Sequence, residues 1–203
     1  TRDTFFEAFV ARKWAPEPET KFVRRDLTTS NHEFQQREKA ISKNIPSILI
    51  ISMARAASSK ITTQIADYLG SSRVDIHSQS SPLDEGLVLG FLLDFKRGGA
   101  VSYTHCRASG KNLNILKSAK LNKFLVHLRD PRQCFLSNYY RMHAANDWAY
   151  YRTYYNDLPL DYDNLNFSEQ IDWHIDNIYE DFWIKWVLNW LKVEESELNS
   201  FNI

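Results

Sequence analysis

Continuous apolar runs and helical stripes alternate along the middle of the chain. The first run, SILIIS at 47–52, is rich in isoleucine and predicts a strand buried on both faces. Ile61, Ile65 and Leu69 then recur at helical spacing, and Gly70 is placed to end that helix. The same reasoning predicts further strands at 74–78, 100–106 and 123–130, with helices at 82–99 and 110–121 between them.

Helices are also predicted on either side of this alternating segment. The polar stretch 1–45 is expected to form a helical wrap around the outside, with its best helix at 30–42. Asn166 opens a last helix, because Glu169 follows three residues later as a capping-box partner. The apolar side of that helix is predicted from residues at helical spacing, namely Ile171, Ile175, Ile178, Phe182, Trp186 and Trp190.

Strands that alternate with helices predict an α/β fold, with a central, mostly parallel sheet flanked by helices. We expect one domain over 1–203, made of the wrap at 1–45 and a core at 46–203. Ligands of such sheets bind beyond the carboxyl ends of the strands. The candidate ligand-binding segments therefore begin at three strand ends, near Ser52, His105 and Arg129.

Composition narrows the functional classes. The chain carries 25 basic and 25 acidic residues, so its formal net charge is zero and gives no support to nucleic-acid or membrane-surface binding. No apolar run reaches the roughly 18 residues that cross a bilayer, and the N-terminus does not resemble a signal peptide. Two cysteines, Cys106 and Cys134, make neither a disulfide framework nor a zinc site, so we expect a cytoplasmic setting.

The loop after the first strand, SMARAASSK at 52–60, is a candidate anion site. It places Arg55, Ser58, Ser59 and Lys60 near a helix N-terminus, where backbone N–H groups and the helix dipole favour a phosphate or sulfate. A capped helix start with solvent-exposed cations is an equally good interpretation of this stretch alone. The loop lacks the GxxxxGK[ST] pattern, which counts against an ordinary nucleoside triphosphatase.

The predicted strand at 123–130 runs into the segment HLRDPRQCFLS, which offers a second set of side chains that could bind a phosphate. Asp130 and Pro131 are a preferred N-cap and first helical residue, so a helix should start there. Arg129 lies at the strand end, where a guanidinium can grip a phosphate, and Ser137 lies on the helix. The alternative is an N-capped helix beside a surface arginine.

Taken together, the two segments resemble the sulfotransferases that use 3′-phosphoadenosine 5′-phosphosulfate (PAPS). In that family the first loop reads S-x-P-[KR]-S-G-[ST]-T and the second segment R-[DN]-x-[RK]-D-x-x-x-S. The resemblance implies that Arg55 contacts the phosphosulfate, and that Arg129 and Ser137 bind the 3′-phosphate. The remaining residues implied for the phosphosulfate loop are Ala56, Ala57, Ser58, Ser59 and Lys60.

The middle strand end supplies the catalytic base in this comparison. VSYTHC resembles the strand that ends in K-T-H in the family, which makes His105 the general base, while Arg55 and Lys60 would stabilise charge on the leaving phosphate. A histidine suits this role because its reference pKa is about 6.5. The other histidines have no comparable placement: His32, His77, His127, His143 and His174.

The resemblance covers about 45–192 and departs from the family at several positions. Ala54 replaces the proline of the loop, Ala56-Ala57 replaces Ser-Gly, and Tyr103 stands where many members have lysine. Alanine reaches positive φ less easily than glycine, so the loop must use ordinary backbone angles or bear strain. The strand and glycine-rich segment that follow in the family are not found, so we expect either a truncation at the C-terminus or a closing part that is lost or reorganised.

The expected reaction is metal-free sulfuryl transfer from PAPS to a hydroxyl or amine of a small-molecule or carbohydrate acceptor. The acceptor itself is not predicted. The tyrosine-rich stretch 146–167 is either a lid over it or a surface loop packed by its own rings, and Asp84 and Glu85 either face it or cap a helix. Two alternatives remain open: a non-catalytic nucleotide-binding relative of the sulfotransferases, and a small-molecule kinase.

Overall fold

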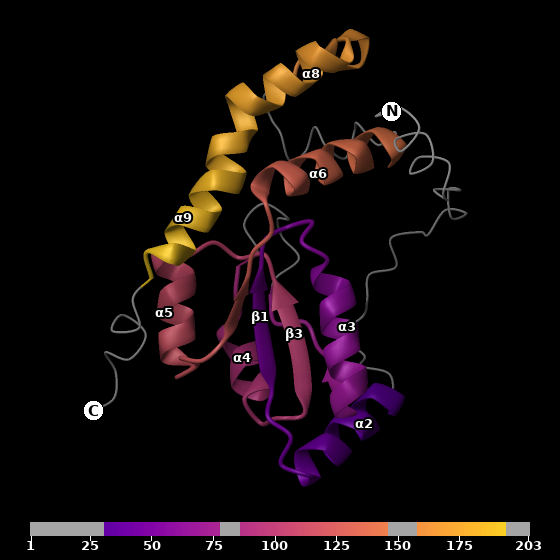
Figure 1. Cartoon of the computed structure of the whole chain (residues 1–203). Helices are drawn as coiled ribbons and strands as arrows, with labels where there is room; N and C mark the ends of the chain where they lie inside the picture. The colour runs from indigo at the N-terminus through magenta and orange to yellow at the C-terminus, as the bar shows by residue number, and fades with distance from the viewer. Residues whose placement is uncertain (1–30, 78–85, 146–157, 194–203) are drawn as a thin grey trace.

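The computed structural model describes residues 31–77, 86–145 and 158–193, and within them a parallel four-stranded sheet forms the centre (Figure 1). The strands run in the order β2-β3-β1-β4, with each neighbouring pair parallel. Their bounds are β1 Ile48–Ser52, β2 Ser72–Arg73, β3 Ala100–Thr104 and β4 Leu125–His127. The predicted α/β class and the parallel sheet are confirmed.

Strand β1 holds two apolar layers together because its alternate side chains face opposite sides of the sheet. Leu49 and Ile51 belong to the larger core, which contains the buried tryptophans of the C-terminal helix. Ile50 packs instead in a smaller cluster with Val101 of β3 and Ala66. A strand buried on both faces must be apolar throughout, which explains the uninterrupted ILII run.

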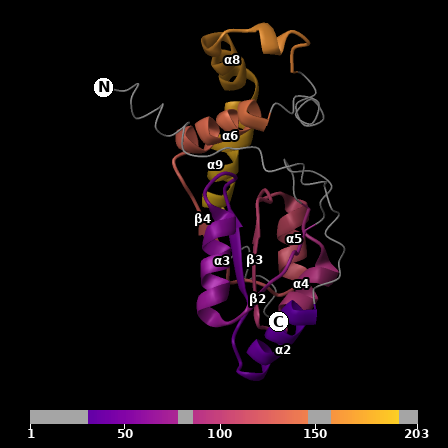
Figure 2. The same ribbon diagram turned by 90° about the vertical axis from the view of Figure 1, so that its right-hand side faces the viewer.

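Helices cover the two faces of the sheet (Figure 2). Helix α3 (Ser58–Leu69) packs on the face of the smaller cluster, and Gly70 ends it in the left-handed conformation, as predicted. Helices α4 (Leu89–Phe95) and α5 (Gly110–Ser118) contribute Leu92, Phe95 and Leu116 to the larger core.

Helix α2 (Asn31–Ser42) confirms the predicted helix at 30–42 and lies at the foot of the sheet, below the amino ends of the strands (Figure 1). Arg37 of α2 binds the carboxylate and the carbonyl of Asp94 and the carbonyl of Gly98. This bonding ties the helix to the turn before β3, away from the strand ends that carry the predicted site.

Two predicted elements differ from the structure. The second strand is Ser72–Arg73 rather than 74–78, because only these residues form a ladder with β3; the chain beyond makes a single antiparallel bridge between His77 and Leu87. That bridge keeps Leu87 extended, so α4 begins at Leu89 and is much shorter than the predicted helix at 82–99. The section 78–85 lies outside the described residues.

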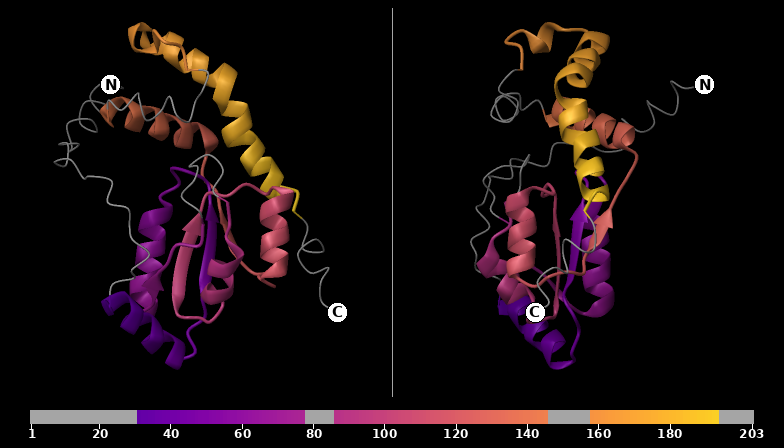
Figure 3. Two further views of the ribbon diagram at one scale, coloured as in Figure 1. Left: turned by 180° about the vertical axis from the view of Figure 1, so that it is seen from behind. Right: turned by 90° about the vertical axis from the view of Figure 1, so that its left-hand side faces the viewer.

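The segment after β4 stands above the carboxyl ends of the strands (Figure 3). Helix α6 (Pro131–Ala145) starts at the predicted Asp130-Pro131, where Asp130 Oδ1 accepts the N–H of Arg132 at 2.9 Å. A short 3₁₀ turn, η1 (Tyr162–Asn164), precedes the final helical stretch. That stretch consists of α8 (Phe167–His174), the π-helical η2 (Ile175–Ile184) and α9 (Lys185–Leu191).

The final helix begins with the predicted capping box between Asn166 and Glu169. Its buried face differs from the prediction in the middle, where Ile175 is exposed and Trp183 is buried. A π-helix repeats through i→i+5 bonds rather than i→i+4, so Ile178 and Trp183 share the inner face.

Within the described ranges, no helix combines the length and the apolar composition needed to cross a bilayer.

Candidate active site at the carboxyl end of the sheet

The loop between β1 and α3 has two residues in the left-handed conformation, although neither is glycine. Arg55 has a φ of 62° and Ala57 has a φ of 64°, while Ala56 between them keeps a negative φ and is buried. The loop is anchored at its start, where Met53 N–H donates to the carbonyl of His127 at 3.0 Å. Left-handed residues of this kind cost about 1–2 kcal/mol each. Of the two outcomes expected for a loop without glycine, ordinary backbone angles or backbone strain, the structure shows strain.

This backbone conformation is suited to binding an anion. Alternation of right- and left-handed residues turns successive backbone N–H groups toward a common centre. The N-cap of α3 is Ala57, whose methyl group cannot accept a hydrogen bond, so the first N–H groups of α3 receive no side-chain cap. Together with the helix dipole, these donors favour a phosphate or sulfate at the start of α3.

Three of the residues predicted to bind the nucleotide meet above β1. Arg55 Nη2 donates to Ser137 Oγ of α6 at 3.3 Å. Arg129 Nη1 donates to the carbonyl of Arg55 at 3.1 Å. The first loop and the RDPRQCFLS segment are therefore in direct contact, although Arg55 and Ser137 are separated by 82 positions in the chain.

Gln133 and Cys134 also belong to this cluster, and sequence reasoning did not select them. Gln133 Oε1 accepts bonds from Nε and Nη2 of Arg129, at 3.2 and 3.1 Å. Its position four residues after Arg129, in the first turn of α6, could have indicated this contact from the sequence. Burial raises the pKa of the Cys134 thiol to about 11, so this side chain is a neutral packing group rather than a nucleophile.

Arg132, which follows Arg129 by one turn, is held away from this cluster by Asp130. Arg132 donates to both carboxylate oxygens of Asp130, at 3.0 and 2.8 Å. Hydrogen bonds from Arg132 hold the pKa of Asp130 below its usual range, so the pair stays ionised. Arg55 and Arg129 therefore remain the positively charged side chains of the cluster.

His105 lies directly after β3, next to the end of β1. Its Nδ1 is 2.7 Å from the carbonyl oxygen of Ser52. A carbonyl can only accept, so Nδ1 must carry the proton and the lone pair of the neutral ring lies on Nε2. This tautomer is the one that a general base acting through Nε2 requires.

Two tryptophans of α9 hold the backbone around His105. Trp186 Nε1 donates to the carbonyls of His105 and Cys106, at 3.0 and 3.1 Å, and Trp190 Nε1 donates to the carbonyl of Cys106 at 3.0 Å. The sequence pattern identified both residues as core positions only. Their indole N–H groups also fix the strand end that carries the candidate base.

The remaining predicted residues lie on or beside these elements. Ser58 is buried in the first turn of α3, and Ser59 and Lys60 are exposed beside it. Among the described residues, Lys60 makes no direct bond to the cluster. The ring of Tyr103, at the position where many sulfotransferases have lysine, lies 5.4 Å from the ring of His105, centroid to centroid. Asp84, Glu85 and the tyrosines of 146–157 lie outside the described residues.

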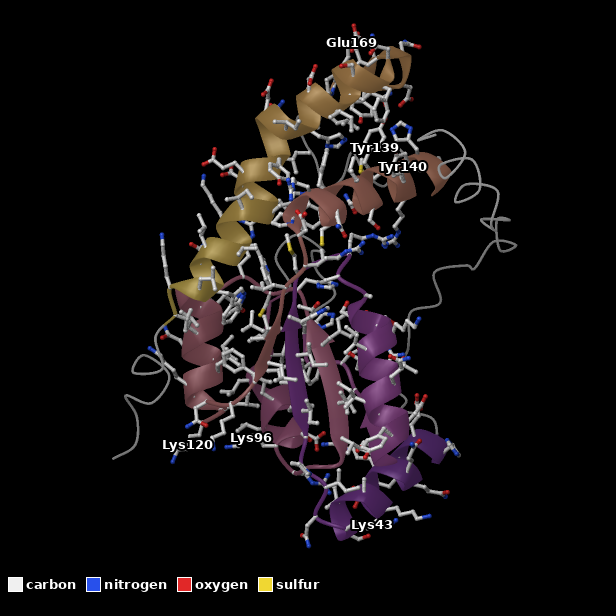
Figure 4. The ribbon with its side chains drawn as sticks, in the orientation of Figure 1. Lys43, Lys96, Lys120, Tyr139, Tyr140 and Glu169 are labelled. Atoms are coloured by element: carbon white, nitrogen blue, oxygen red, sulfur yellow. The ribbon has the colours of Figure 1, made fainter. Side chains whose placement is uncertain are left out.

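The acidic, histidine and cysteine side chains do not gather into a metal-binding group of three or more anywhere in the described part of the chain. Lysines such as Lys43, Lys96 and Lys120 lie at the opposite, lower end of the molecule, while α6 with Tyr139 and Tyr140 stands above the site (Figure 4).

Comparisons of the chain with models of protein families, with curated proteins and with solved structures find no match. What the site does is therefore inferred from its residues and their geometry.

Proposed function

We propose that this protein is a PAPS-dependent sulfotransferase. The observation that carries the proposal is the contact of Arg55 with Ser137 and Arg129, at 3.3 and 3.1 Å. These contacts join the two segments whose sequences resemble the phosphosulfate loop and the 3′-phosphate segment of the family. Two phosphate-binding elements in contact fit a ligand that carries phosphate groups at both its 3′ and 5′ positions.

The left-handed conformation at Ala57 supports the same assignment. It is the conformation that glycine adopts readily, and Ala57 replaces the glycine of the family loop. Strain of this kind persists only where the surroundings enforce it, and it concentrates at ligand-binding sites. The loss of glycine has therefore not changed this loop into an ordinary turn.

The reaction would be an in-line displacement at sulfur. The acceptor oxygen forms a new bond to sulfur while the bond from sulfur to the bridging oxygen of PAPS breaks. The acceptor proton passes to Nε2 of His105, and 3′-phosphoadenosine 5′-phosphate (PAP) leaves with the bonding electron pair. Arg55 and the N–H groups at the start of α3 would stabilise the negative charge that develops on the leaving group.

Replacement of His105 tests the chemical step. His105→Ala should lower the rate of transfer of labelled sulfate from PAPS to a panel of hydroxyl and amine acceptors by roughly 10² to 10⁴-fold. Binding of PAP should be nearly unchanged, because the nucleotide contacts lie on other residues. Sulfate transfer at the wild-type rate in this variant would rule out His105 as the base.

Two further variants make that result specific. His105→Asn keeps an N–H group that can donate to the Ser52 carbonyl but has no basic nitrogen, so it should be as slow as the alanine variant. His32→Ala changes an exposed histidine on α2, at the far end of the sheet, and should leave the rate unchanged.

A non-catalytic nucleotide-binding relative remains the second candidate. Tyr103 stands where many family members have lysine, beside the ring of His105. Such a protein would bind PAP, yet transfer no labelled sulfate to any acceptor of the panel. Transfer of phosphate from ATP with magnesium would instead identify a small-molecule kinase.

A further inference from the structure

Arg107 is a cation at the catalytic strand end that the reaction described above does not use. It follows His105 by two residues, in the segment between β3 and α5. Like His105 it is partly exposed, whereas Cys106 between them is fully buried. Its own carbonyl accepts a bond from the Asn112 side chain at 3.0 Å, which fixes the backbone at this point.

The guanidinium of Arg107 lies over an aromatic ring rather than against a carboxylate. Its Cζ is 5.8 Å from the centroid of the Phe182 ring of η2. Its Nε is enclosed and has no hydrogen-bond partner, and no ion pair to Arg107 occurs in the described part of the chain. The two terminal nitrogens are not enclosed in this way, so the open edge of the guanidinium reaches the surface.

The nearest acidic group does not neutralise Arg107. Asp181 is close enough for the Arg107 charge to help lower its pKa, but the larger causes are the hydrogen bond and the charge of Lys185. Lys185 forms a salt bridge with Asp181 one turn along the helix. The carboxylate of Asp181 is thus already engaged by another cation.

An enclosed donor without an acceptor lowers stability by about 1–3 kcal/mol, so such a group calls for a functional or structural explanation. A guanidinium packed on a ring face is also partly desolvated and presents a planar fork of donors, which suits carboxylates and sulfates. Arg107 follows the candidate base by only two residues, so the backbones of the two residues lie within about 7 Å of each other.

We propose that Arg107 is an anion subsite for the acceptor, and that the acceptor carries a carboxylate or a sulfate ester close to the hydroxyl that is sulfated. This inference rests on the proposed sulfotransferase function, because it takes His105 as the group beside which the acceptor sits. Arg107 would then select anionic over neutral acceptors and orient them, without contacting the nucleotide.

The side-chain Nε–H signals of ¹⁵N-labelled full-length protein can test this without knowledge of the acceptor. The Arg107 signal is assigned as the one missing from the Arg107→Lys spectrum. The protein, in saturating PAP, is titrated with glucuronate as the carboxylate, glucose 6-sulfate as the sulfate ester and glucose as the neutral control, at matched ionic strength. Either anion should shift the Arg107 signal saturably, with a dissociation constant in the millimolar range. The anion that binds more tightly shows whether the acceptor group is a carboxylate or a sulfate ester.

The signal of Arg97 is the internal control, because this exposed arginine already pairs with Asp94 and Glu38. It should show no saturable shift. The inference is wrong if neither anion shifts the Arg107 signal saturably, or if glucose shifts it equally. The PAP titration reports separately on the proposed function, because PAP should shift Arg55 and Arg129 before any sugar is added. Lack of that response would reject the nucleotide site, and the sugar titrations would still show whether Arg107 binds anions.

Discussion

At the scale of single residues, the backbone of the loop after β1 shapes the candidate site. Arg55 and Ala57 adopt positive φ, which glycine would allow at little cost and which these residues adopt under strain. The carbonyl of Arg55 meets Arg129, and its guanidinium meets Ser137. The strained residue Arg55 therefore links the two segments that are proposed to bind the phosphate groups.

Ala57→Gly should stabilise the protein. Removal of the methyl group relieves the left-handed strain, although glycine also gains freedom in the unfolded chain, so we expect a net rise of about 1 kcal/mol in the free energy of unfolding. Urea denaturation of the wild type and the variant measures this difference directly.

Ala56→Gly is the matched control for that prediction. Ala56 is buried and has a negative φ, so glycine there brings no relief and should lower the free energy of unfolding. Equal destabilisation by both variants would mean that Ala57 is not strained in solution.

At the scale of elements, hydrophobic periodicity and local boundary signals together predicted those helices and strands that local sequence determines. β1, α3, α6 and the capping box before α8 begin or end at the residues expected, because a cap, a proline or a glycine marks each boundary. Periodicity failed where long-range pairing decides. The bridge between His77 and Leu87 removes residues from the predicted strand and helix, and no local signal announces it.

The turn between α4 and β3 shows how one glycine holds two elements together. Gly99 has a φ of 67°, and a Cβ built there would lie 2.7 Å from the carbonyl oxygen of Arg37 in α2. Gly99→Ala should therefore lower the free energy of unfolding by more than about 1 kcal/mol.

Gly90→Ala provides the comparison, because a Cβ at this helical position in α4 meets no atom within 4 Å. Alanine is the better helix former by about 1 kcal/mol, so this variant should be at least as stable as the wild type. Thermal unfolding of both variants gives the answer; similar losses in the two would contradict the close approach of α2 to Gly99.

A buried histidine at the end of α8, packed against α6, makes the stability of this region depend on pH. Burial, with a smaller contribution from the charge of His143, lowers the pKa of His174 to about 4. Its ring is surrounded by the aromatic side chains of Phe135, Tyr139, Tyr162 and Trp173.

The folded state holds His174 neutral, whereas the unfolded chain binds a proton near pH 6.5. The stabilisation is therefore complete above pH 6.5 and is lost as the pH falls toward 4. We expect the free energy of unfolding to be about 2 kcal/mol lower at pH 5 than at pH 7, as measured by urea denaturation.

His174→Gln should remove most of that difference between the two pH values, while His32→Gln, an exposed histidine on α2, should leave it intact. A wild-type protein equally stable at pH 5 and pH 7 would show that His174 is not held neutral by burial.

At the scale of the whole molecule, the site forms because parallel strands end at one edge. The loop after β1, His105 after β3 and Arg129 after β4 are far apart in sequence, yet adjacent strands β3, β1 and β4 bring them together. This convergence could be predicted from the alternation of strands and helices. The individual contacts could not, because they depend on side-chain partners such as Gln133, Trp186 and Trp190.

The same limit applies to Arg107, whose importance appears only when its surroundings are known. The sequence places it near His105, but does not reveal that its guanidinium lies on Phe182. Phe182 belongs to η2, which is distant in the chain from the end of β3 that precedes Arg107.

Calorimetric titration with PAP in the presence of a metal chelator tests the central claim most directly. The wild type should bind PAP without magnesium, and Arg129→Ala should bind it roughly ten to a hundred times more weakly, since a hydrogen bond to a charged group contributes about 1.5–3 kcal/mol. Arg132→Ala, which removes the partner of Asp130, should bind like the wild type. Absence of PAP binding to the wild type, or binding only of ATP with magnesium, would contradict the sulfotransferase assignment.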